Sequence, residues 1–260
     1  MEKLEGPNMF SEERRRHILE IIEKDDRVNT KYLCEKFNTT PVTIRKDLAI
    51  LEEKGELLRT HGGAIQGKKL YQGLALSEKE KMFLEEKNRI VKNAVNLILP
   101  GDTIILDSGS TISLLAKEIR NLSGITIITN AVNIAYDLSK SNNVIILTGG
   151  HLKKDSMTLT GPLADVVLNR ISAGKLFFGV DGIDFGVGLT TPDIMEANTT
   201  RCMMAIAGEK ILLVDSSKIG RRSLAVISKI DEIDQIITTK KFTEKEIKKF
   251  TNLGVKVKIV

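Results

Sequence analysis

Five residues, "DSGST" at 107–111, carry the chain from the apolar run at 104–106 into a segment with helical periodicity. A glycine lets the backbone approach a ligand closely, and the amides at the start of a helix attract anions. The hydroxyl groups of the serines and the threonine add further donors. Asp107, Ser108, Gly109, Ser110 and Thr111 could therefore hold a phosphate group, although such sequences also occur as ordinary helix caps.

Four further segments end an apolar run in small polar or charged residues, at 128–130, 147–150, 177–197 and 214–220. Ligands of parallel α/β sheets bind outside the carboxyl ends of the strands, where such residues would converge. Backbone amides and a lysine suit a phosphate, and carboxylates suit sugar hydroxyls. We therefore predict a site for a phosphorylated polyol, to which these segments contribute Thr129, Asn130, Gly149, Gly150, Asp181, Asp184, Glu196 and Lys218. For the carboxylates, the lysine and the paired glycines, a role as solvated loop or turn residues is the alternative.

The elements that would position this site begin near residue 101, where short β-branched runs alternate with amphipathic segments. Strands are predicted at 103–107, 125–129, 144–148, 175–180, 210–215, 224–228, 235–239 and 255–260, with helices at 111–120, 131–139, 161–171, 194–207 and 243–252. This alternation predicts an α/β fold with a Rossmann-like, mostly parallel sheet. Ahead of it, Ser77 and Glu80 have the spacing of a capping box and predict one long helix over 77–98, stopped by Pro100.

The first third of the chain is rich in charge and has helical periodicity, which predicts three helices. Ser11 is expected to cap the first helix. Thr30 is expected to cap a short second helix, in which Leu33 and Phe37 form an apolar pair one turn apart. A tight turn follows, and Thr40 is expected to cap the third helix. Two short helices joined by such a turn are typical of a helix-turn-helix.

The third helix would be the one that enters a major groove of DNA. Pro41 suits its first position, and Ile44, Leu48 and Leu51 form its buried stripe. Gly55 ends it, and "ELLRTHGGAI" then predicts a small β-hairpin. The residues predicted to contact DNA are Thr30, Thr40, Pro41, Thr43, Arg45, Lys46, Arg59 and His61. The alternative is that the charges at 45–47 form only a solvated helix face.

Residues 28–65, "VNTKYLCEKFNTTPVTIRKDLAILEEKGELLRTHGGAI", closely resemble the helix-turn-helix of the DeoR family of bacterial transcriptional regulators. In that resemblance "TIRKDL" corresponds to the recognition helix and "RTHGGA" to the wing of a winged helix. Lys46 stands where many members have a second arginine, a difference that would alter base preference more than DNA binding itself.

The second half of the chain also resembles this family, whose sensor domain is similar to ribose-5-phosphate isomerase. The landmarks are "DSGST", "TGG", "FFGVDGID" and "DSSK". The resemblance implies a winged helix-turn-helix at 9–66, a linker at 67–76, and a sensor and oligomerisation domain at 77–260. It further implies a repressor of sugar or polyol catabolism that a phosphorylated sugar releases from double-stranded operator DNA. Thr200 replaces the lysine of many members, with Arg201 as a possible substitute.

The isomerase likeness supplies a rival interpretation, an enzyme that carries a DNA-binding head. "GVDGID" looks like the isomerases' "GADExD", and Glu196 lies near the place of their catalytic carboxylate. Proton transfer between two sugar carbons also needs a cation beside the developing oxyanion. Here "GLTTPD" replaces the lysine-containing loop of those enzymes. We therefore expect a binding pocket and no enzymatic activity. A third alternative is a module that activates transcription or has no effector.

Composition narrows the function classes only a little. The chain has 260 residues, 42% hydrophobic, with a net charge of +5 that permits an anionic partner. No apolar run approaches the ~18 residues of a membrane span, and no signal-peptide core is visible, so we expect a cytoplasmic protein without a membrane partner. Cys34 and Cys202 are expected to be packing residues, and the scattered histidines predict no metal site. No cofactor is expected. Operator symmetry and the family resemblance favour a homodimer or homotetramer.

Overall fold

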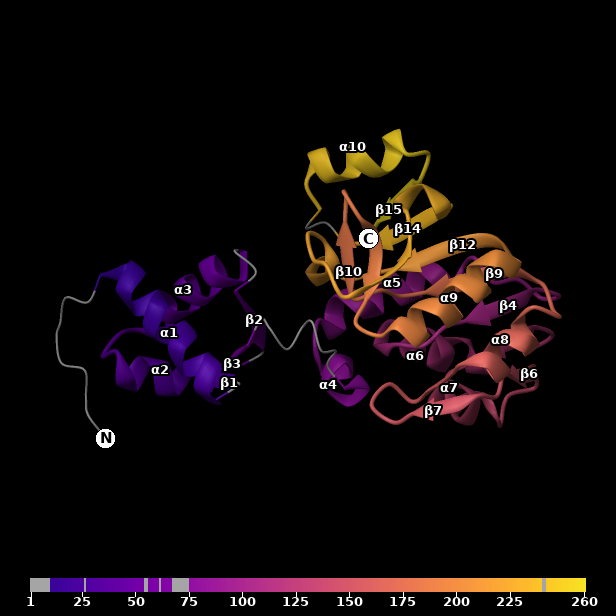
Figure 1. Ribbon diagram of the computed structural model, residues 1–260, viewed down its shortest axis with the longest axis horizontal. Coiled ribbons are helices and arrows are strands. Elements are labelled where there is room, and N and C mark those ends of the chain that lie inside the picture. The colour runs from indigo at the N-terminus through magenta and orange to yellow at the C-terminus, as the bar shows by residue number, and fades with distance from the viewer. Residues whose placement is uncertain (1–9, 26, 54–55, 61, 67–74, 240–241) are drawn as a thin grey trace. The chain divides into compact units, whose positions relative to one another are not determined.

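The computed structural model describes residues 10–25, 27–53, 56–60, 62–66, 75–239 and 242–260. The chain divides into two units, Met1–Gln72 and Gly73–Val260 (Figure 1). The predicted linker at 67–76 lies outside the described residues except for its last two positions, where a helix already begins at Leu76.

The N-terminal unit is a three-helix domain with a small antiparallel sheet of order β1-β3-β2. Its elements are α1 (Ser11–Asp25), β1 (Arg27–Asn29), α2 (Thr30–Lys36), α3 (Pro41–Glu53), β2 (Leu57–Thr60) and β3 (Gly63–Gln66). The three predicted helices and the hairpin are confirmed. The strand β1 was not predicted, because three residues between two helices carry too little pattern to distinguish them from a loop.

The core of this unit forms where the helical stripes meet. Ile44, Leu48 and Leu51 of α3 are almost fully buried, together with Leu33 of α2 and Ile18 of α1. This confirms the predicted buried stripe, whose spacing places all three α3 residues on one face.

The predicted cap of α3 is confirmed, and that of α2 differs by one residue. Thr40 caps α3 as predicted, since its Oγ1 accepts a hydrogen bond of 3.3 Å from the amide of Thr43. The predicted cap at Thr30 is wrong. Asn29 is the cap of α2, and its Oδ1 accepts from the amide of Tyr32 at 2.7 Å, while Thr30 is the first helical residue. The predicted stop at Gly55 lies outside the described residues.

One glycine of the hairpin is required by a close approach between strands. A Cβ atom at Gly63 would lie 1.8 Å from the carbonyl oxygen of Val28 in β1. No side chain fits there, so the glycine lets β1 pair with β3 and complete the three-stranded sheet.

The C-terminal unit is built on a seven-stranded parallel sheet of order β15-β14-β12-β9-β4-β5-β6 (Figure 1). The strands of this sheet are β4 (Thr103–Leu106), β5 (Thr126–Thr129), β6 (Val144–Leu147), β9 (Ala173–Phe178), β12 (Ala207–Leu213), β14 (Gln235–Thr238) and β15 (Lys256–Ile259). The helices are α4 (Leu76–Lys81), α5 (Leu84–Val95), α6 (Ser110–Glu118), α7 (Val132–Leu138), α8 (Pro162–Leu168), α9 (Ile194–Ile206) and α10 (Glu244–Asn252), with short 3-10 turns η2 (Ile119–Asn121), η3 (Ser216–Lys218) and η4 (Ile230–Glu232). The predicted α/β fold with a mostly parallel sheet is confirmed.

Both faces of this sheet are covered. Neighbouring residues of one strand belong to opposite hydrophobic clusters, as Ile104 and Ile105 of β4 do, and likewise Phe177 and Phe178 of β9. Strands buried on both faces need no polar alternation, which is why they appear in the sequence as continuous apolar runs.

Two small sheets beside the main one were not predicted. The hairpin of β7 (His151–Lys153) and β8 (Thr158–Thr160) is one. The other joins β10 (Gly182–Asp184), β11 (Gly188–Thr191) and β13 (Ala225–Ser228) in antiparallel order. The strand predicted at 224–228 thus exists, but it pairs with β11 outside the main sheet.

The predicted single helix over 77–98 is wrong. The segment forms two helices, α4 and α5, which are separated at Met82, in extended conformation, and Phe83, in left-handed conformation with φ 53°. Ser77 does not cap α4, which starts after Ala75 without a side-chain cap. Neither glycine nor proline marks the break, so local sequence gives no sign of it. Tertiary contacts of α4 hold it apart from α5, as described below.

Candidate effector pocket and DNA-binding surface

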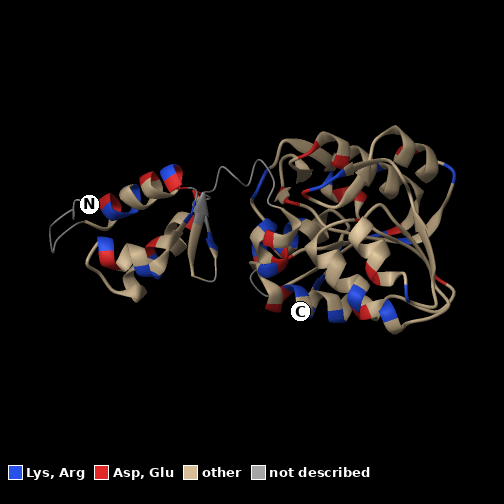
Figure 2. Cartoon of the chain, turned by 90° about the horizontal axis from the view of Figure 1, so that it is seen from below, with Lys and Arg blue, Asp and Glu red and all other residues tan. Residues whose placement is uncertain are grey.

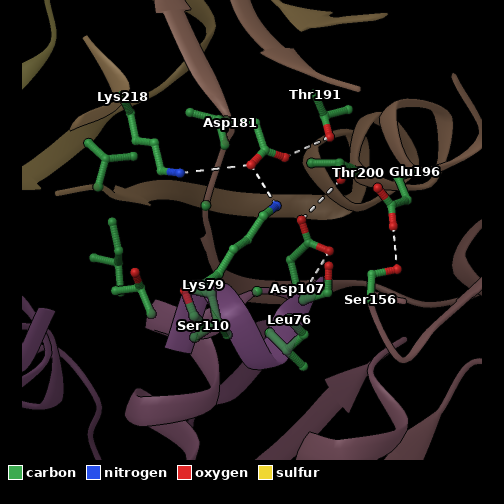
Figure 3. Close-up of a pocket in the computed structure, with 18 of the residues that line it drawn as sticks. Leu76, Lys79, Asp107, Ser110, Ser156, Asp181, Thr191, Glu196, Thr200 and Lys218 are labelled. Carbon is green, nitrogen blue, oxygen red and sulfur yellow. Dashed lines mark hydrogen bonds and ion pairs between the residues drawn. The ribbon is translucent and has the colours of Figure 1, made fainter. Parts of the chain in front are cut away.

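A pocket lies at the carboxyl ends of β4, β9 and β12, the edge of the sheet where the sequence predicted a ligand site (Figure 3). Eight of the predicted residues line it, namely Asp107, Ser108, Gly109, Ser110, Thr111, Asp181, Glu196 and Lys218. They come from segments far apart in the sequence, and the parallel sheet brings them together because its strand ends meet at one edge.

The first turn of α6 forms one wall of the pocket. The amide of Asp107 still continues the ladder of β4 by donating to the carbonyl of Phe177 at 3.1 Å. Gly109 then turns the chain with φ 108°, a conformation that side chains rarely adopt, and α6 starts at Ser110. No side chain caps α6 at Gly109. Its first amides, which lack carbonyl partners within the helix, are therefore suited to an anion.

A carboxylate between two lysines forms the cationic side of the pocket. Asp181 Oδ1 lies 2.6 Å from Lys79 Nζ of α4 and 3.8 Å from Lys218 Nζ of η3, and its Oδ2 accepts from the Thr191 hydroxyl at 3.2 Å (Figure 3). Burial by itself would raise the pKa of Asp181, but the charges of Lys79 and Lys218 outweigh it and lower the pKa to about 2. Asp181 is therefore ionised at neutral pH.

A second carboxylate, Asp107, has the opposite electrostatic environment. It is 4% exposed, and burial raises its pKa to about 7, although hydrogen bonds from the Ser108 amide at 2.7 Å and the Thr200 hydroxyl at 3.0 Å oppose the shift. The nearby charge of Glu196 adds to the increase. Near neutral pH Asp107 can thus carry a proton and donate it to a ligand oxygen.

The third carboxylate, Glu196, lies in the first turn of α9, whose cap is Asp193. Its Oε1 accepts from the hydroxyls of Ser156 and Thr158, the latter at 3.1 Å, and lies 3.4 Å from Lys153 Nζ. The hairpin β7–β8 and the loop within it supply these three partners, so a small unpredicted sheet orients the predicted carboxylate.

A buried lysine lies behind this pocket. Lys87 of α5 is 2% exposed, and its Nζ donates to the carbonyl oxygen of Lys79. Burial lowers the pKa of Lys87 to about 8, while the charge of Asp215 partly opposes the shift. Lys87 thus ties α5 to the last turn of α4.

Five predicted residues lie outside the pocket, and two of them have local contacts instead. Thr129 Oγ1 accepts from the Ala131 amide, and Asp184 Oδ1 accepts from two amides of its own turn, those of residues 186 and 187. Gly149 and Gly150 have positive φ, and Asn130 is buried behind the strand end. Asp184 thus starts the turn between β10 and β11.

Sequence reasoning missed several residues that line the pocket. Lys79, Ser156 and Thr191 were not candidates, because a helix, a hairpin loop and a β-strand of a small sheet bring them to the pocket. Thr200, noted in the sequence as an unusual residue, also lines it through its bond to Asp107. Arg201 does not replace a lysine there, since it is exposed and donates to the carbonyl of Val226 at 2.6 Å.

The N-terminal unit presents the predicted DNA-contacting residues at its surface. Thr40, Pro41, Arg45, Lys46 and Arg59 are exposed, and Thr30 and Thr43 are half-buried; His61 lies outside the described residues. Val42, between them on α3, is 72% exposed. An apolar side chain held out to solvent on this face suits contact with a thymine methyl group.

Asp47 does not belong to this solvated face. It is 2% exposed and forms ion pairs with Arg14 Nε at 2.6 Å and Arg15 Nη1 at 3.5 Å of α1. Figure 2 shows acidic and basic residues interspersed along the helices, so charge alone does not mark a DNA-binding face. The predicted contact residues of α3 are recognised instead by their exposure.

Nowhere in the described residues does a helix combine the length and the hydropathy of a membrane span. The same residues contain no cluster of His, Cys, Asp and Glu side chains that could hold a metal ion.

Comparison with known proteins identifies both units. A model of the DeoR-like helix-turn-helix domain matches residues 14–69, and a model of the DeoR C-terminal sensor domain matches residues 82–240. A lactose phosphotransferase system repressor from Staphylococcus epidermidis is 36% identical over 89% of this chain and 93% of its own length. The HTH-type transcriptional regulator GlpR of Haloferax volcanii is 33% identical over 88% of this chain and 90% of its own. A ribose-5-phosphate isomerase structure with phospho-erythronic acid matches 52% of this chain and 53% of its own at 18% identity, with a TM-score of 0.40. Both of these relatives align along most of the chain and are regulators of transcription.

Proposed function

The chain belongs to the DeoR family of transcriptional regulators, and on that premise we propose that it represses an operon for the catabolism of a sugar or polyol. A phosphorylated sugar in the pocket would release it from operator DNA. The observation that carries the effector half is the pocket itself, where an uncapped helix start and two lysines lie close to four carboxylates, those of Asp107, Asp181, Glu196 and Asp215. The similarity of this chain to a lactose phosphotransferase system repressor supports a sugar as the class of effector.

In the DNA complex, α3 would lie in the major groove. Arg45 and Lys46 are long enough to reach guanine edges or phosphates, and the hydroxyls of Thr40 and Thr43 suit the backbone. Arg59, on β2 of the wing, would contact the flanking phosphates. Thr30 and Pro41, at the starts of α2 and α3, would complete the contacts to the backbone.

In the effector complex, the phosphate would bind the first turn of α6 and a lysine of the pocket. Charge-assisted bonds to backbone amides and an ammonium are the strongest that a phosphate can form here. Asp181 and Glu196 would then accept hydrogen bonds from the sugar hydroxyls, and protonated Asp107 would donate one.

Release from DNA would follow from a difference in effector affinity between two arrangements of an oligomer. If the effector binds more tightly to the arrangement whose DNA-binding domains do not match the half-site spacing, operator affinity falls. A homodimer or homotetramer would supply the paired domains, as operator symmetry requires.

The direct test combines a mobility-shift assay with a thermal-shift panel. The full chain should bind the promoter region next to its own gene, and one of glycerol 3-phosphate, ribose 5-phosphate or glucose 6-phosphate should raise its melting temperature and release the DNA. A ligand that binds only the folded state stabilises it by about 2.7 kcal/mol at 100-fold its Kd. If the chain does not change the electrophoretic mobility of the DNA even at low salt, the role in transcriptional regulation is contradicted. If no compound changes the melting temperature, the proposed class of effector is contradicted.

The phosphate position has its own test. Ser110→Ala combined with Thr111→Ala should leave operator binding intact and abolish release by the sugar phosphate, because both residues line the pocket at the start of α6. Ser77→Ala is the control, since Ser77 is exposed and does not line the pocket. Normal release in the double variant would refute the assignment of the phosphate to this turn.

A further inference from the structure

The helix α4 is the first described element of the C-terminal unit, and it contributes directly to the pocket. Leu76 and Lys79 both line it. In the sequence, α4 follows the segment 67–74 that leads from the DNA-binding unit. A change in the position of α4 would therefore be passed along the chain to the segment that carries the DNA-binding domain.

Few contacts hold α4 in place, and the pocket supplies one of them. The amide of Leu76 donates to the carbonyl of Asp155 at 2.9 Å at the start of the helix. Lys87 donates to the carbonyl of Lys79, and α4 packs on α6. A further polar contact of α4 is the ion pair of 2.6 Å between Lys79 Nζ and Asp181 Oδ1.

The connection to α5 is a break in the helix. Met82 is extended and Phe83 is left-handed, so the helical hydrogen bonds are interrupted between α4 and α5. Left-handed backbone at a residue other than glycine costs free energy and is retained only where the surrounding contacts impose it. A change in the contacts of α4 thus has a natural pivot at residues 82–83.

A bound phosphate would change the contact of Lys79. It carries up to two negative charges and three acceptor oxygens, whereas Asp181 offers one charge. Sugar hydroxyls that donate to Asp181 would weaken the same pair from the other side. Lys218 faces the same carboxylate at 3.8 Å, but it belongs to η3, after β12, and is not near the segment 67–74 in the sequence.

We propose that Lys79 couples the pocket to DNA binding: effector replaces Asp181 as the partner of the Lys79 ammonium and thereby shifts α4, the pocket-lining helix nearest in sequence to the DNA-binding domain. Lys218, by contrast, contributes to affinity alone. This inference rests on the proposed function, because it assumes an effector with a phosphate or another anionic group.

The test compares Lys79→Met with Lys218→Met. Each substitution removes one of the two ammonium groups that face the Asp181 carboxylate. Operator affinity of the full chain is measured without ligand and at saturating concentration of the sugar phosphate that stabilises the wild type. The wild type should lose about tenfold or more in operator affinity. Lys218→Met should need more ligand but reach the same loss at saturation. Lys79→Met should bind operator and ligand, yet change its operator affinity less than about twofold.

Lys81→Met serves as the control, since this lysine is an exposed residue of α4 that does not line the pocket; it should behave as the wild type. Full release of Lys79→Met at saturation would overturn the coupling role while leaving the proposed function intact. Failure of the wild type to bind any compound of the panel would instead contradict the proposed function, and the coupling role with it.

A second measurement follows α4 itself. The chain contains no tryptophan, so Ser77→Trp places a single indole on the exposed side of α4. Saturating sugar phosphate should shift the fluorescence emission of this indole when Ser77→Trp is the only substitution and when it is combined with Lys218→Met. The emission should not shift when Ser77→Trp is combined with Lys79→Met. If ligand binding is verified by thermal shift but the ligand changes the emission of none of the three proteins, α4 does not respond and the proposal is overturned.

Discussion

Each unit of the chain holds one carboxylate between two cations, yet the two arrangements serve different ends. In the N-terminal unit, Asp47 lies 2.6 Å from Arg14 and 3.5 Å from Arg15. In the C-terminal unit, Asp181 lies 2.6 and 3.8 Å from two lysines. The charges and distances are nearly the same. The surroundings and the type of cation differ.

Both arginines of the first cluster come from α1, and Asp47 lies against the core of the unit. A guanidinium holds a carboxylate in a fixed planar geometry, which suits a permanent link between two helices. The lysines of the second cluster come from separate elements and line a pocket. An ammonium is a compact charge on a flexible stem and can exchange its partner for a ligand. We infer that the first cluster stabilises the fold, and we propose that the second recognises a ligand.

The largest expected effect is the loss of stability of the N-terminal unit when the carboxylate of the first cluster is removed. Asp47→Ala should lower the free energy of unfolding of the N-terminal unit by about 3 kcal/mol, because it leaves two largely buried guanidinium groups without this carboxylate. Calorimetry of the full chain should show the transition of this unit at a lower temperature and that of the C-terminal unit unchanged. A change below about 1 kcal/mol would show that the pair is not structural.

The second prediction concerns the pH dependence of the pocket. The pKa of Asp107 is raised to about 7, so burial favours the protonated form and stability falls as pH rises from the ordinary aspartate pKa toward 7. The free energy of unfolding should therefore fall by about 2 kcal/mol between pH 5 and pH 7 because of this one group. The pKa of Asp181 is lowered to about 2, so its contribution is lost only on acidification and does not enter this window.

Asp107→Asn removes the titrating group and keeps the size of the side chain. The variant should therefore gain about 2 kcal/mol relative to the wild type as pH rises from 5 to 7. Chemical denaturation of the C-terminal unit at several pH values measures this difference. Parallel curves for the two proteins would mean that Asp107 does not titrate in this range.

A somewhat smaller effect is expected on the DNA-binding face. Arg45→Ala should weaken operator binding by about 1–3 kcal/mol if the arginine contacts a base, with stability changed by no more than about 0.5 kcal/mol. Lys24→Ala, at an exposed position in the last turn of α1, is the control and should bind as the wild type. Equal operator affinity for Arg45→Ala and the wild type would rule out the docking of α3 in the major groove.

The smallest effect belongs to an exposed pair on the same helix as the first cluster. Arg16 lies 3.7 Å from Glu20, with side chains 69% and 58% exposed. Arg16→Ala should change stability by less than about 0.5 kcal/mol, because water screens the pair. This variant isolates burial as the cause of the Asp47 effect. A loss as large as that of Asp47→Ala would contradict the comparison.

Much of the fold could be predicted because its signals are local. The stripe of Ile44, Leu48 and Leu51 predicted α3, and the apolar runs predicted every strand of the main sheet. The break between α4 and α5 could not be predicted, since residues 82 and 83 include neither glycine nor proline, the usual local signals for the end of a helix. The same holds for β1 and the hairpin β7–β8, which are short and depend on pairing.

The pocket was predictable where its residues follow strands of the main sheet, as Ser110 and Asp181 do. It was not predictable where a residue arrives from another element. Lys79 looked like one of many charges on a helix, and Asp47 looked like part of a solvated face. Burial and partner identity are properties of the folded chain, and spacing along one element does not encode them.

The sequence by itself determined the strands of the main sheet, the helix-turn-helix and the place of a polar site at the strand ends, because hydrophobic periodicity and turn residues act over a few positions. The tertiary structure decided which charges are paired, which carboxylate holds a proton near neutral pH, and that α4 reaches into the pocket. Those features arise from groups more than 30 residues apart, such as Arg14 with Asp47 and Lys79 with Asp181, whose interaction free energy depends on the burial that only folding creates.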